Sequence, residues 1–251
     1  MINEQKLNCL LLHGWGINKS IWDGMVDGLK GFDHIDAVCL YTIAEEAKAN
    51  GIEALASCLK EKIKNNTVVI AWSFGGLIAT RLASLTDKIK GIVYIASPPC
   101  FVNKSDWNYV LDKKSISDLQ SNLIRDPKNT IEYFSGLIAH GDNDTKKMIA
   151  TMRTNIANES QCSTLSNWLE ELLEQDQRNE LTALNIPTLH LLGQNDALIK
   201  GDLIIQLKQF YPKVECELLK NSCHAPFISQ PQETINLING FIIARLKQQS
   251  L

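Results

Sequence analysis

Short hydrophobic runs alternate along the chain with longer segments in which hydrophobic residues recur every three or four positions. Runs of this kind, rich in valine, isoleucine and leucine, are typical of strands buried on both faces of a parallel sheet. The longer segments have the spacing of amphipathic helices. The pattern therefore predicts an α/β fold, with a mostly parallel sheet covered by helices on both faces. The expected strands are residues 9–12, 36–40, 67–70, 91–96, 188–192 and 214–219.

The strand pattern is interrupted between residues 101 and 179. In this stretch apolar residues recur at helical spacing, as between Leu165 and Trp168, and strand-like runs are missing. A helical insertion between two strands of a sheet is expected to lie as a lid over the active site. The predicted organisation is a core of residues 1–100 and 180–251, with a helical lid of residues 101–179 inserted in it.

A serine lies at the centre of the run Ala-Trp-Ser-Phe-Gly-Gly, residues 71–76. The run follows the expected strand 67–70 and precedes a segment, 77–85, with helical spacing. A strand, a tight turn with a central serine and a helix together indicate a nucleophile elbow, with Ser73 above the carboxyl edge of the sheet. Ala71 stands where this motif usually has glycine. The alternative is an ordinary strand-to-helix turn, and the strand before the serine favours the catalytic interpretation.

A catalytic serine needs a general base and a third group that orients the base. After an elbow of this kind, the expected order along the chain is serine, acid and histidine, with the last two on loops after later strands. Asp196 follows the expected strand 188–192, and His224 lies on the loop after the expected strand 214–219. The sequence therefore predicts Ser73, Asp196 and His224 as a catalytic triad.

Other acids and histidines have simpler explanations. Asp202 is expected in the first turn of the next helix, where a carboxylate complements the helix dipole, and Asp176 is expected to close the helix before it. His34 and His140 lie among polar residues and are expected on the surface. His190 lies within an apolar strand, which favours a hydrogen-bonded core histidine over a base. The histidine after the last strand is therefore the predicted base.

Oxyanion donors are expected at two backbone positions. The first strand runs into His-Gly-Trp-Gly, residues 13–16. One donor of an oxyanion hole is the N–H of the residue after the nucleophile, here Phe74, and the other comes from the loop after an early strand, here Trp15. Gly14 lets the backbone turn, the His13 ring is expected to brace the loop, and the Trp15 ring is expected to face the pocket.

With these motifs the whole chain resembles the α/β-hydrolases, and more narrowly the pimeloyl-[acyl-carrier protein] methyl ester esterases of biotin synthesis. The elbow and the His-Gly-Trp-Gly run are shared by many esterases. Two runs are more particular to the narrower family: Ala-Ser-Pro-Pro-Cys-Phe at residues 96–101, with Trp107, and His-Ala-Pro-Phe-Ile-Ser-Gln-Pro at residues 224–231. The resemblance implies an α/β-hydrolase fold with a helical lid, and serine carboxylesterase activity that releases methanol.

The resemblance also assigns residues. The family's triad falls on Ser73, Asp196 and His224. Its oxyanion donors fall on Trp15 and Phe74. The lid segment that contacts the acyl chain in the family corresponds to Phe134, Ser135, Gly136, Leu137 and Ile138. The substrate is expected to be carried on acyl carrier protein, a transient partner, and the reaction is expected to need no metal or organic cofactor.

The lid departs from the family where the carrier protein is expected to bind. Asn129 and Tyr133 stand where the family has arginines, Lys146 keeps a positive charge at a third such position, and Ile138 replaces a glutamine. The region 31–66 is also shortened. A broad-specificity short-chain carboxylesterase outside the biotin pathway is therefore the alternative function, and a non-catalytic binding protein of this fold is a third class.

A basic rim would suit an acidic carrier protein, although a solvated helix face is the simpler explanation of lysines in such helices. The basic residues in question are Lys113, Lys114, Arg125, Lys128, Lys146, Lys147 and Arg153.

Composition narrows the functional classes further. The chain has 251 residues, of which 45% are hydrophobic and 21% charged, with a net charge of −3, which is typical of a globular protein and gives no support for nucleic-acid binding. No apolar run approaches the roughly 20 residues that cross a bilayer. Residues 1–7 lack an apolar signal core, so a cytoplasmic protein that does not bind membranes is expected. Seven cysteines without C-x-x-C spacing indicate reduced thiols and argue against zinc. A monomer is expected.

Overall fold

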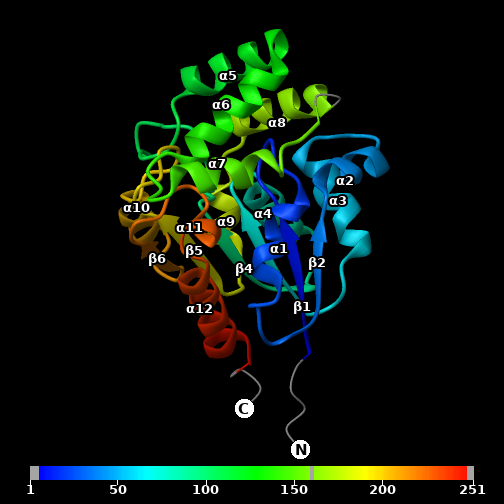
Figure 1. Ribbon diagram of the computed structural model, residues 1–251. Helices are drawn as coiled ribbons and strands as arrows, with labels where there is room; N and C mark the ends of the chain where they lie inside the picture. Colours follow the sequence, from blue (N-terminus) through cyan, green and yellow to red (C-terminus); the bar gives the residue numbers. More distant parts are fainter. Residues whose placement is uncertain (1–5, 159–160, 248–251) are drawn as a thin grey trace, which may run out of the picture.

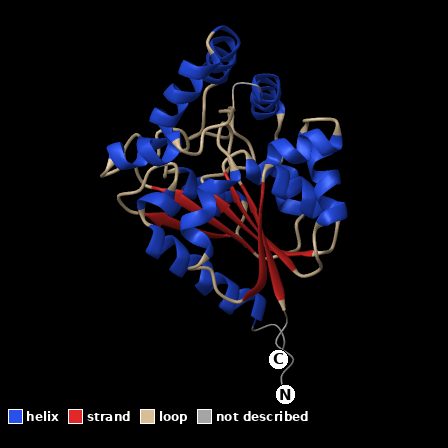
Figure 2. Ribbon diagram, turned by 45° about the vertical axis from the view of Figure 1, so that its right-hand side comes forward, coloured by secondary structure: helices blue, strands red, loops and turns tan. Residues whose placement is uncertain are grey.

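The structure, a computed structural model, describes residues 6–158 and 161–247. Within these residues, six parallel strands form one sheet in the order β2-β1-β3-β4-β5-β6 (Figures 1 and 2). The predicted α/β fold with a parallel sheet is confirmed. The strands are β1 (Leu7–Leu12), β2 (Phe32–Val38), β3 (Thr67–Trp72), β4 (Ile89–Ile95), β5 (Thr188–Gly193) and β6 (Glu215–Leu219).

Helices lie on both faces of the sheet and beyond its carboxyl edge. They are α1 (Asp23–Val26), α2 (Leu40–Ala47), α3 (Ile52–Lys62), α4 (Gly75–Leu85), α5 (Lys113–Arg125), α6 (Pro127–Ala139), α7 (Thr145–Arg153), α8 (Cys162–Glu174), α9 (Arg178–Ala183), α10 (Leu203–Phe210), α11 (Pro226–Ser229) and α12 (Pro231–Ile242). A 3₁₀ turn, η1 (Lys19–Trp22), precedes α1, and a π-helical turn, η3 (Ile243–Lys247), follows α12.

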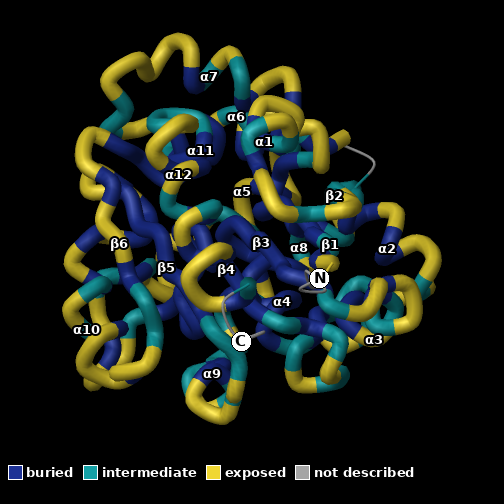
Figure 3. The backbone as a smooth tube through the Cα atoms, turned by 90° about the horizontal axis from the view of Figure 1, so that it is seen from below, coloured by how far each residue is buried: buried dark blue, intermediate teal, exposed yellow. Residues whose placement is uncertain are grey.

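The core lies along the middle strands. Every residue of β3 is buried, and its Val68, Val69 and Ile70 suit a strand that is covered on both faces. Seen from below in Figure 3, the strands lie between α1, α11 and α12 on one side and α3, α4 and α9 on the other. The two-sided covering that the hydrophobic runs predict is therefore present.

The second strand and the helix after it differ from the prediction. The expected strand 36–40 is shifted, because β2 begins at Phe32 and ends at Val38. Leu40, expected as the last residue of that strand, instead begins α2. β2 is an edge strand whose His34 is exposed, so its limits are not marked by a hydrophobic run. The other strands begin and end within two residues of the predicted positions.

Helices α5 to α8 follow β4 and precede β5, and Figure 1 shows them above the carboxyl ends of the strands. Helix α5 packs against both α6 and α8, and α6 packs against α7. The insertion is helical, as the sequence indicates, and the lid boundaries at residues 101 and 179 stay a prediction. Among the described helices, none is long and apolar enough to cross a lipid bilayer.

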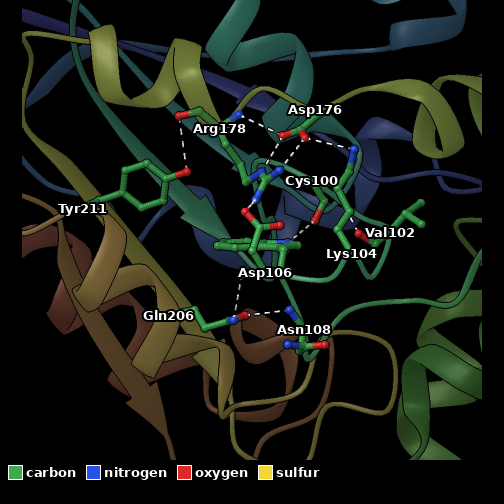
Figure 4. Close-up of polar contacts among 10 residues, drawn as sticks. Cys100, Val102, Lys104, Asp106, Asn108, Asp176, Arg178, Gln206 and Tyr211 are labelled. Carbon is green, nitrogen blue, oxygen red and sulfur yellow. Dashed lines mark hydrogen bonds and ion pairs between the residues drawn. The ribbon is translucent and has the colours of Figure 1, made fainter.

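The chain enters and leaves this insertion at one place, where four charged residues meet (Figure 4). Arg178 donates to both carboxylate oxygens of Asp176 at 2.8 Å and to Asp106 Oδ2 at 2.9 Å. Lys104 Nζ lies 3.0 Å from Asp176 Oδ2. We call these four residues the crossing cluster, because Lys104 and Asp106 lie on the segment that leaves β4, and Asp176 and Arg178 on the one that returns from α8. The Arg178 guanidinium also lies 5.8 Å from the ring centre of Trp107.

Candidate active site

Ser73 occupies the sharp turn between β3 and α4. Its φ is +51°, in the left-handed region that non-glycine residues rarely adopt, and this strain is typical of a nucleophile elbow. The two residues at the start of α4 must be glycines for the turn to form. A Cβ on Gly75 would lie 2.8 Å from the carbonyl oxygens of Leu12 and His13, and one on Gly76 would lie 1.8 Å from Ser97 Oγ. The Ser-x-Gly-Gly order of the sequence thus follows from close packing.

Ser73, His224 and Asp196 form one hydrogen-bonded chain. Ser73 Oγ lies 3.0 Å from His224 Nε2, and His224 Nδ1 lies 2.8 Å from Asp196 Oδ2. Ser73 is 7% exposed, Asp196 5% and His224 1%. With Nδ1–H donating to the carboxylate, Nε2 is left to accept the serine proton. The arrangement fits a catalytic triad.

The acid and the histidine are both held in place by their own loops. Asp196 Oδ1 accepts hydrogen bonds from the N–H groups of Leu198 at 2.8 Å and Ile199 at 3.0 Å. The Trp72 indole donates to the His224 carbonyl oxygen at 2.8 Å. The acid and the base of the triad are therefore each fixed by contacts outside the triad, which lowers the cost of holding the productive geometry.

Three of these supporting residues had no predicted role. Trp72 holds the histidine loop, and Ser97 Oγ donates to the Ser73 carbonyl oxygen at 2.7 Å. At the end of β5, a Cβ on Gly193 would lie 2.1 Å from the Cys223 carbonyl oxygen, so only glycine allows the acid and histidine loops to approach. Trp72 and Ser97 belong to the motif runs 71–76 and 96–101, but their partners are too distant along the chain to be inferred from the sequence.

Both predicted oxyanion positions lie beside Ser73. Phe74 is the residue before the first turn of α4, and a Cβ on Gly14 would lie 3.3 Å from Ser73 Cβ, so the loop that carries Trp15 abuts the nucleophile. Within the described residues, neither the Trp15 nor the Phe74 N–H takes part in a backbone hydrogen bond. Unpaired N–H groups can meet a developing negative charge, and the Phe74 N–H has in addition the N-terminus of α4 behind it.

The loop of residues 13–16, which carries the predicted donor Trp15, is called the oxyanion loop. The His13 ring braces it, as the sequence predicts. His13 Nδ1 donates to the Gly14 carbonyl oxygen at 2.9 Å, and Nε2 accepts from the N–H of Leu40 at 2.9 Å. Burial lowers the pKa of His13 to about 4, although the Gly14 contact favours the charged form. The ring is therefore neutral at pH 7, which its acceptor role at Nε2 requires.

The predicted acyl-contact segment lies on α6. Phe134 packs edge-on against Trp15 at a ring-centre distance of 4.8 Å. Ser135 Oγ donates to the Ile131 carbonyl oxygen of its own helix, and Ile138 is buried in the core. Gly136 and Leu137 are partly exposed. The segment therefore touches the oxyanion loop through Phe134, while its contact with an acyl chain stays a prediction.

His190 does not behave as the hydrogen-bonded core histidine that we expect from the sequence. It is 1% exposed and stacks on Tyr94 at a ring-centre distance of 4.5 Å, but within the described residues neither ring nitrogen has a partner. Burial lowers its pKa to about 3. The prediction of satisfied nitrogens was wrong, because the polar neighbours of a side chain on a sheet depend on how the strands are packed.

The remaining candidates do not add to the site. Asp202 immediately precedes α10, at its N-terminus as expected. Cys223, next to the histidine, is buried, and burial raises the pKa of its thiol to about 11, so it is not a thiolate at pH 7. In the described part of the chain, no group of three or more His, Cys, Asp and Glu residues is arranged to hold a metal ion.

Comparisons with known proteins agree with this geometry. The family model described as alpha/beta hydrolase fold matches residues 52–231. The curated pimeloyl-[acyl-carrier protein] methyl ester esterase of Aeromonas hydrophila subsp. hydrophila is 32% identical over 240 residues, which cover 93% of this chain and 94% of that protein. The protein of the same name from Nitrosomonas europaea is 27% identical over 236 residues, covering 92% and 94%.

Solved structures support the fold alone. A bromoperoxidase from Bacillus anthracis superposes with a TM-score of 0.77 at 19% identity, and an esterase from Exiguobacterium antarcticum with a TM-score of 0.78 at 16% identity. In both cases the match covers 96% of this chain and 93% of the other.

Proposed function

The chain belongs to the α/β hydrolase fold family, and we propose that it is a serine esterase that hydrolyses the methyl ester of a pimeloyl chain carried on acyl carrier protein. The observation that carries the reaction class is the hydrogen-bonded chain from Ser73 through His224 to Asp196. The substrate is supported by the likeness, over nearly the whole chain, to esterases named for it.

In the first half-reaction the Ser73 hydroxyl attacks the ester carbonyl carbon. His224 Nε2, 3.0 Å from Ser73 Oγ, takes the proton. Asp196 holds the ring through Nδ1 and stabilises the imidazolium that forms. The negative charge on the former carbonyl oxygen is met by the N–H groups of Trp15 and Phe74, and in other serine hydrolases each such donor contributes about 3–4 kcal/mol to lowering the barrier. His224 then protonates the departing methanol, which leaves an acyl-enzyme on Ser73.

In the second half-reaction the same groups act on water. His224 removes a proton from a water molecule that attacks the acyl-enzyme carbonyl, and the oxyanion donors are used again. The Ser73 hydroxyl then leaves with the proton from His224. The products are methanol and a free carboxylate at the end of the acyl chain. Every proton transfer and bond change in the two half-reactions uses the triad, the two backbone N–H donors, the ester or water.

The carrier protein is proposed to approach over the lid helices α5 to α7, which carry the basic residues that the sequence singles out. Two of these residues have acidic neighbours: Lys114 Nζ lies 2.6 Å from Asp118, and Arg153 lies 4.0 Å from Glu132. Tyr133 on the same surface is 62% exposed. A monomer in the cytoplasm that meets the carrier protein only transiently is the form in which we propose that it acts.

The proposal is tested by turnover of pimeloyl-acyl-carrier-protein methyl ester by the purified protein, beside a simple short-chain ester and the Ser73→Ala variant. We expect a strong preference for the carrier-linked ester, and loss of both activities in Ser73→Ala with an unchanged circular dichroism spectrum. Cleavage of only the simple ester would replace the proposal with the broad short-chain carboxylesterase. Activity of Ser73→Ala close to that of the wild type would refute the assignment of the nucleophile, and a wild-type protein that cleaves neither ester would favour a non-catalytic role.

A further inference from the structure

The oxyanion loop is joined to the lid by a short antiparallel bridge. The Asn18 N–H donates to the Asn155 carbonyl oxygen at 2.8 Å, and the Ala157 N–H donates to the Gly16 carbonyl oxygen at 2.9 Å. Ile17 and Ile156 are the paired residues between these two hydrogen bonds. We call residues 155–157 the lid bridge. They lie between α7 and α8, whereas the oxyanion loop follows β1, so about 140 residues of chain separate two segments that touch.

Side-chain contacts of Trp15 and Ser20 reinforce the bridge. The Trp15 indole donates to the Leu165 carbonyl oxygen of α8 at 2.9 Å, and its ring packs on Phe134 of α6. Ser20 Oγ lies 2.5 Å from Asn155 Oδ1 and also contacts Asn18 Oδ1, and its single proton can be donated to either oxygen. Asn155 is 7% exposed, and its Nδ2 donates to the Thr151 carbonyl oxygen at 2.8 Å. Asn155 therefore ties the end of α7 to the segment that follows the oxyanion loop.

The second donor residue touches the same part of the lid. The Phe74 ring stacks on Trp168 of α8 at a ring-centre distance of 4.9 Å. Trp168 in turn stacks on Tyr41 at 4.8 Å, and Tyr41 stacks on His13 at 5.5 Å. Helix α8 is thus in contact with the residue of each oxyanion donor, through Leu165 for Trp15 and through Trp168 for Phe74.

The oxyanion loop needs such support because its own backbone is pliable. Gly14 and Gly16 flank Trp15, and Gly16 adopts a φ of +73° that other residues rarely reach. A donor N–H lowers the barrier only when it lies about 2.7–3.1 Å from the position of the oxyanion. His13 fixes the start of the loop, and the lid bridge fixes the residues directly after Trp15.

We propose that the lid bridge sets the position of the Trp15 N–H in the oxyanion hole, with Asn155 as a positioning residue. The inference rests on the proposed function, since it assigns a part of the lid to the transition state of the same reaction. The lid then acts on kcat through the core loop that it holds, in addition to any contact that it makes with substrate.

Two variants break the bridge in different ways. Asn155→Ala removes the side-chain contacts with Ser20 and Thr151 and keeps the backbone hydrogen bond from Asn18. Ala157→Pro removes the N–H that donates to the Gly16 carbonyl oxygen, and the extended conformation that proline imposes on the preceding residue suits the bridge position of Ile156. Asn158→Ala is the matched control, because Asn158 is exposed and lies one residue beyond the bridge.

With a simple short-chain ester, kcat should fall about 10-fold in Asn155→Ala and up to about 100-fold in Ala157→Pro, because a displaced donor stabilises the transition state less. KM should stay within about twofold in both, since substrate binding in the ground state does not need the oxyanion contact. Asn158→Ala should match the wild type in kcat and KM.

Inhibition by phenylboronic acid separates positioning from general damage. Its tetrahedral adduct with Ser73 uses the oxyanion donors, so its inhibition constant should rise in step with the fall in kcat/KM. Retained kcat in both bridge variants would overturn the proposal. So would a lower kcat with an unchanged boronate constant, because that result indicates a structural role alone. The proposed function is tested separately, by wild-type turnover that is lost in Ser73→Ala. A result that refutes the role of the lid bridge therefore leaves the proposed esterase activity standing.

Discussion

Asp196 in the active site and Asp176 in the crossing cluster each hold a basic side chain, but in different surroundings. Asp196 Oδ2 lies 2.8 Å from His224 Nδ1, and both side chains are almost fully buried, at 0% and 2% exposure. Asp176 Oδ1 lies 2.8 Å from Arg178 Nε, and these side chains are 26% and 22% exposed. The same kind of contact is thus buried in the active site and partly exposed where the helical insertion meets the core.

The other hydrogen-bond partners of each carboxylate indicate its role. Asp196 is fixed by two backbone N–H groups of its own loop, so its orientation does not depend on the histidine. Asp176 is held by cationic side chains, chiefly by hydrogen bonds from Arg178, and its pKa is lowered to about 2. The first carboxylate orients a neighbour for chemistry, and the second joins two chain segments. Substituting the same residue type at both places should therefore change different measurements.

The largest effect is expected from Asp196→Asn. The amide can still accept the two backbone hydrogen bonds, but its NH₂ group no longer accepts from His224 Nδ1–H, which favours the wrong tautomer. Turnover of either ester should fall by roughly 10⁴-fold, as in other Ser-His-Asp triads, while the midpoint of urea unfolding changes little. A fall of less than about 10-fold, in a triad of this kind, would point to another carboxylate such as Asp202.

His190 differs from both carboxylates, because it is a buried ionisable side chain without a polar partner. Within the described residues neither of its ring nitrogens has a hydrogen-bond partner. Its pKa is lowered from 6.5 to about 3, so below pH 6.5 the unfolded chain binds a proton that the folded chain does not. Stability should therefore fall as the pH is lowered, by about 2 kcal/mol at pH 5 from this residue alone. His190→Phe, which keeps an aromatic ring against Tyr94, should remove that part of the loss.

Urea unfolding at pH 7 and pH 5 measures this difference. His13, whose pKa is lowered to about 4, contributes a loss of the same sign, so part of the acid sensitivity should remain in His190→Phe. His140→Gln, which replaces an exposed histidine, is the matched control variant. An equal pH difference in wild type and His190→Phe would show that the buried histidine is not the cause.

The smallest effect is expected from Asp176→Asn. Loss of the charge should lower the free energy of unfolding at pH 7 by about 1–2 kcal/mol, a discounted value because the pair is partly exposed to solvent. Because the side chain of Asp176 contacts Arg178 and Lys104 and no triad residue within the described part of the chain, kcat for the short-chain ester should stay within about threefold. Asp118→Asn is the matched control, since Asp118 pairs with Lys114 at the surface and should contribute less than about 1 kcal/mol.

Acid titration then identifies the charge as the cause. Since the pKa of Asp176 is about 2 in the folded protein and 3.8 ordinarily, its contribution to stability is complete above about pH 4 and is lost as the pH falls toward 2. The difference between wild type and Asp176→Asn should shrink over that range, and also in 1 M salt. A difference that is the same at pH 7 and pH 2 would mean that Asp176 acts through packing.

Local patterns of apolar and polar residues were enough to predict the strands and turns that carry the triad. The buried strands are short apolar runs, and in a parallel sheet their carboxyl ends meet at one edge, so Ser73, Asp196 and His224 could be placed together from their positions after strands. The edge strand β2 has no such run, and its predicted limits were wrong. His190 was expected to have hydrogen-bond partners, but periodicity reports burial and says nothing of which polar atoms lie nearby.

The amino-acid order was enough to predict the parallel sheet, the elbow at Ser73 and the order of the triad, because each depends on residues that are close along the chain or on the shared edge of the strands. The meeting of Asn155 with Ser20, the stacking of Trp168 on Phe74 and the link from Asp176 through Arg178 to Asp106 were visible only in the folded chain. Each of them joins segments that lie far apart in the sequence. They depend on the packing of the helical insertion against the core, which no local pattern of polar and apolar residues specifies.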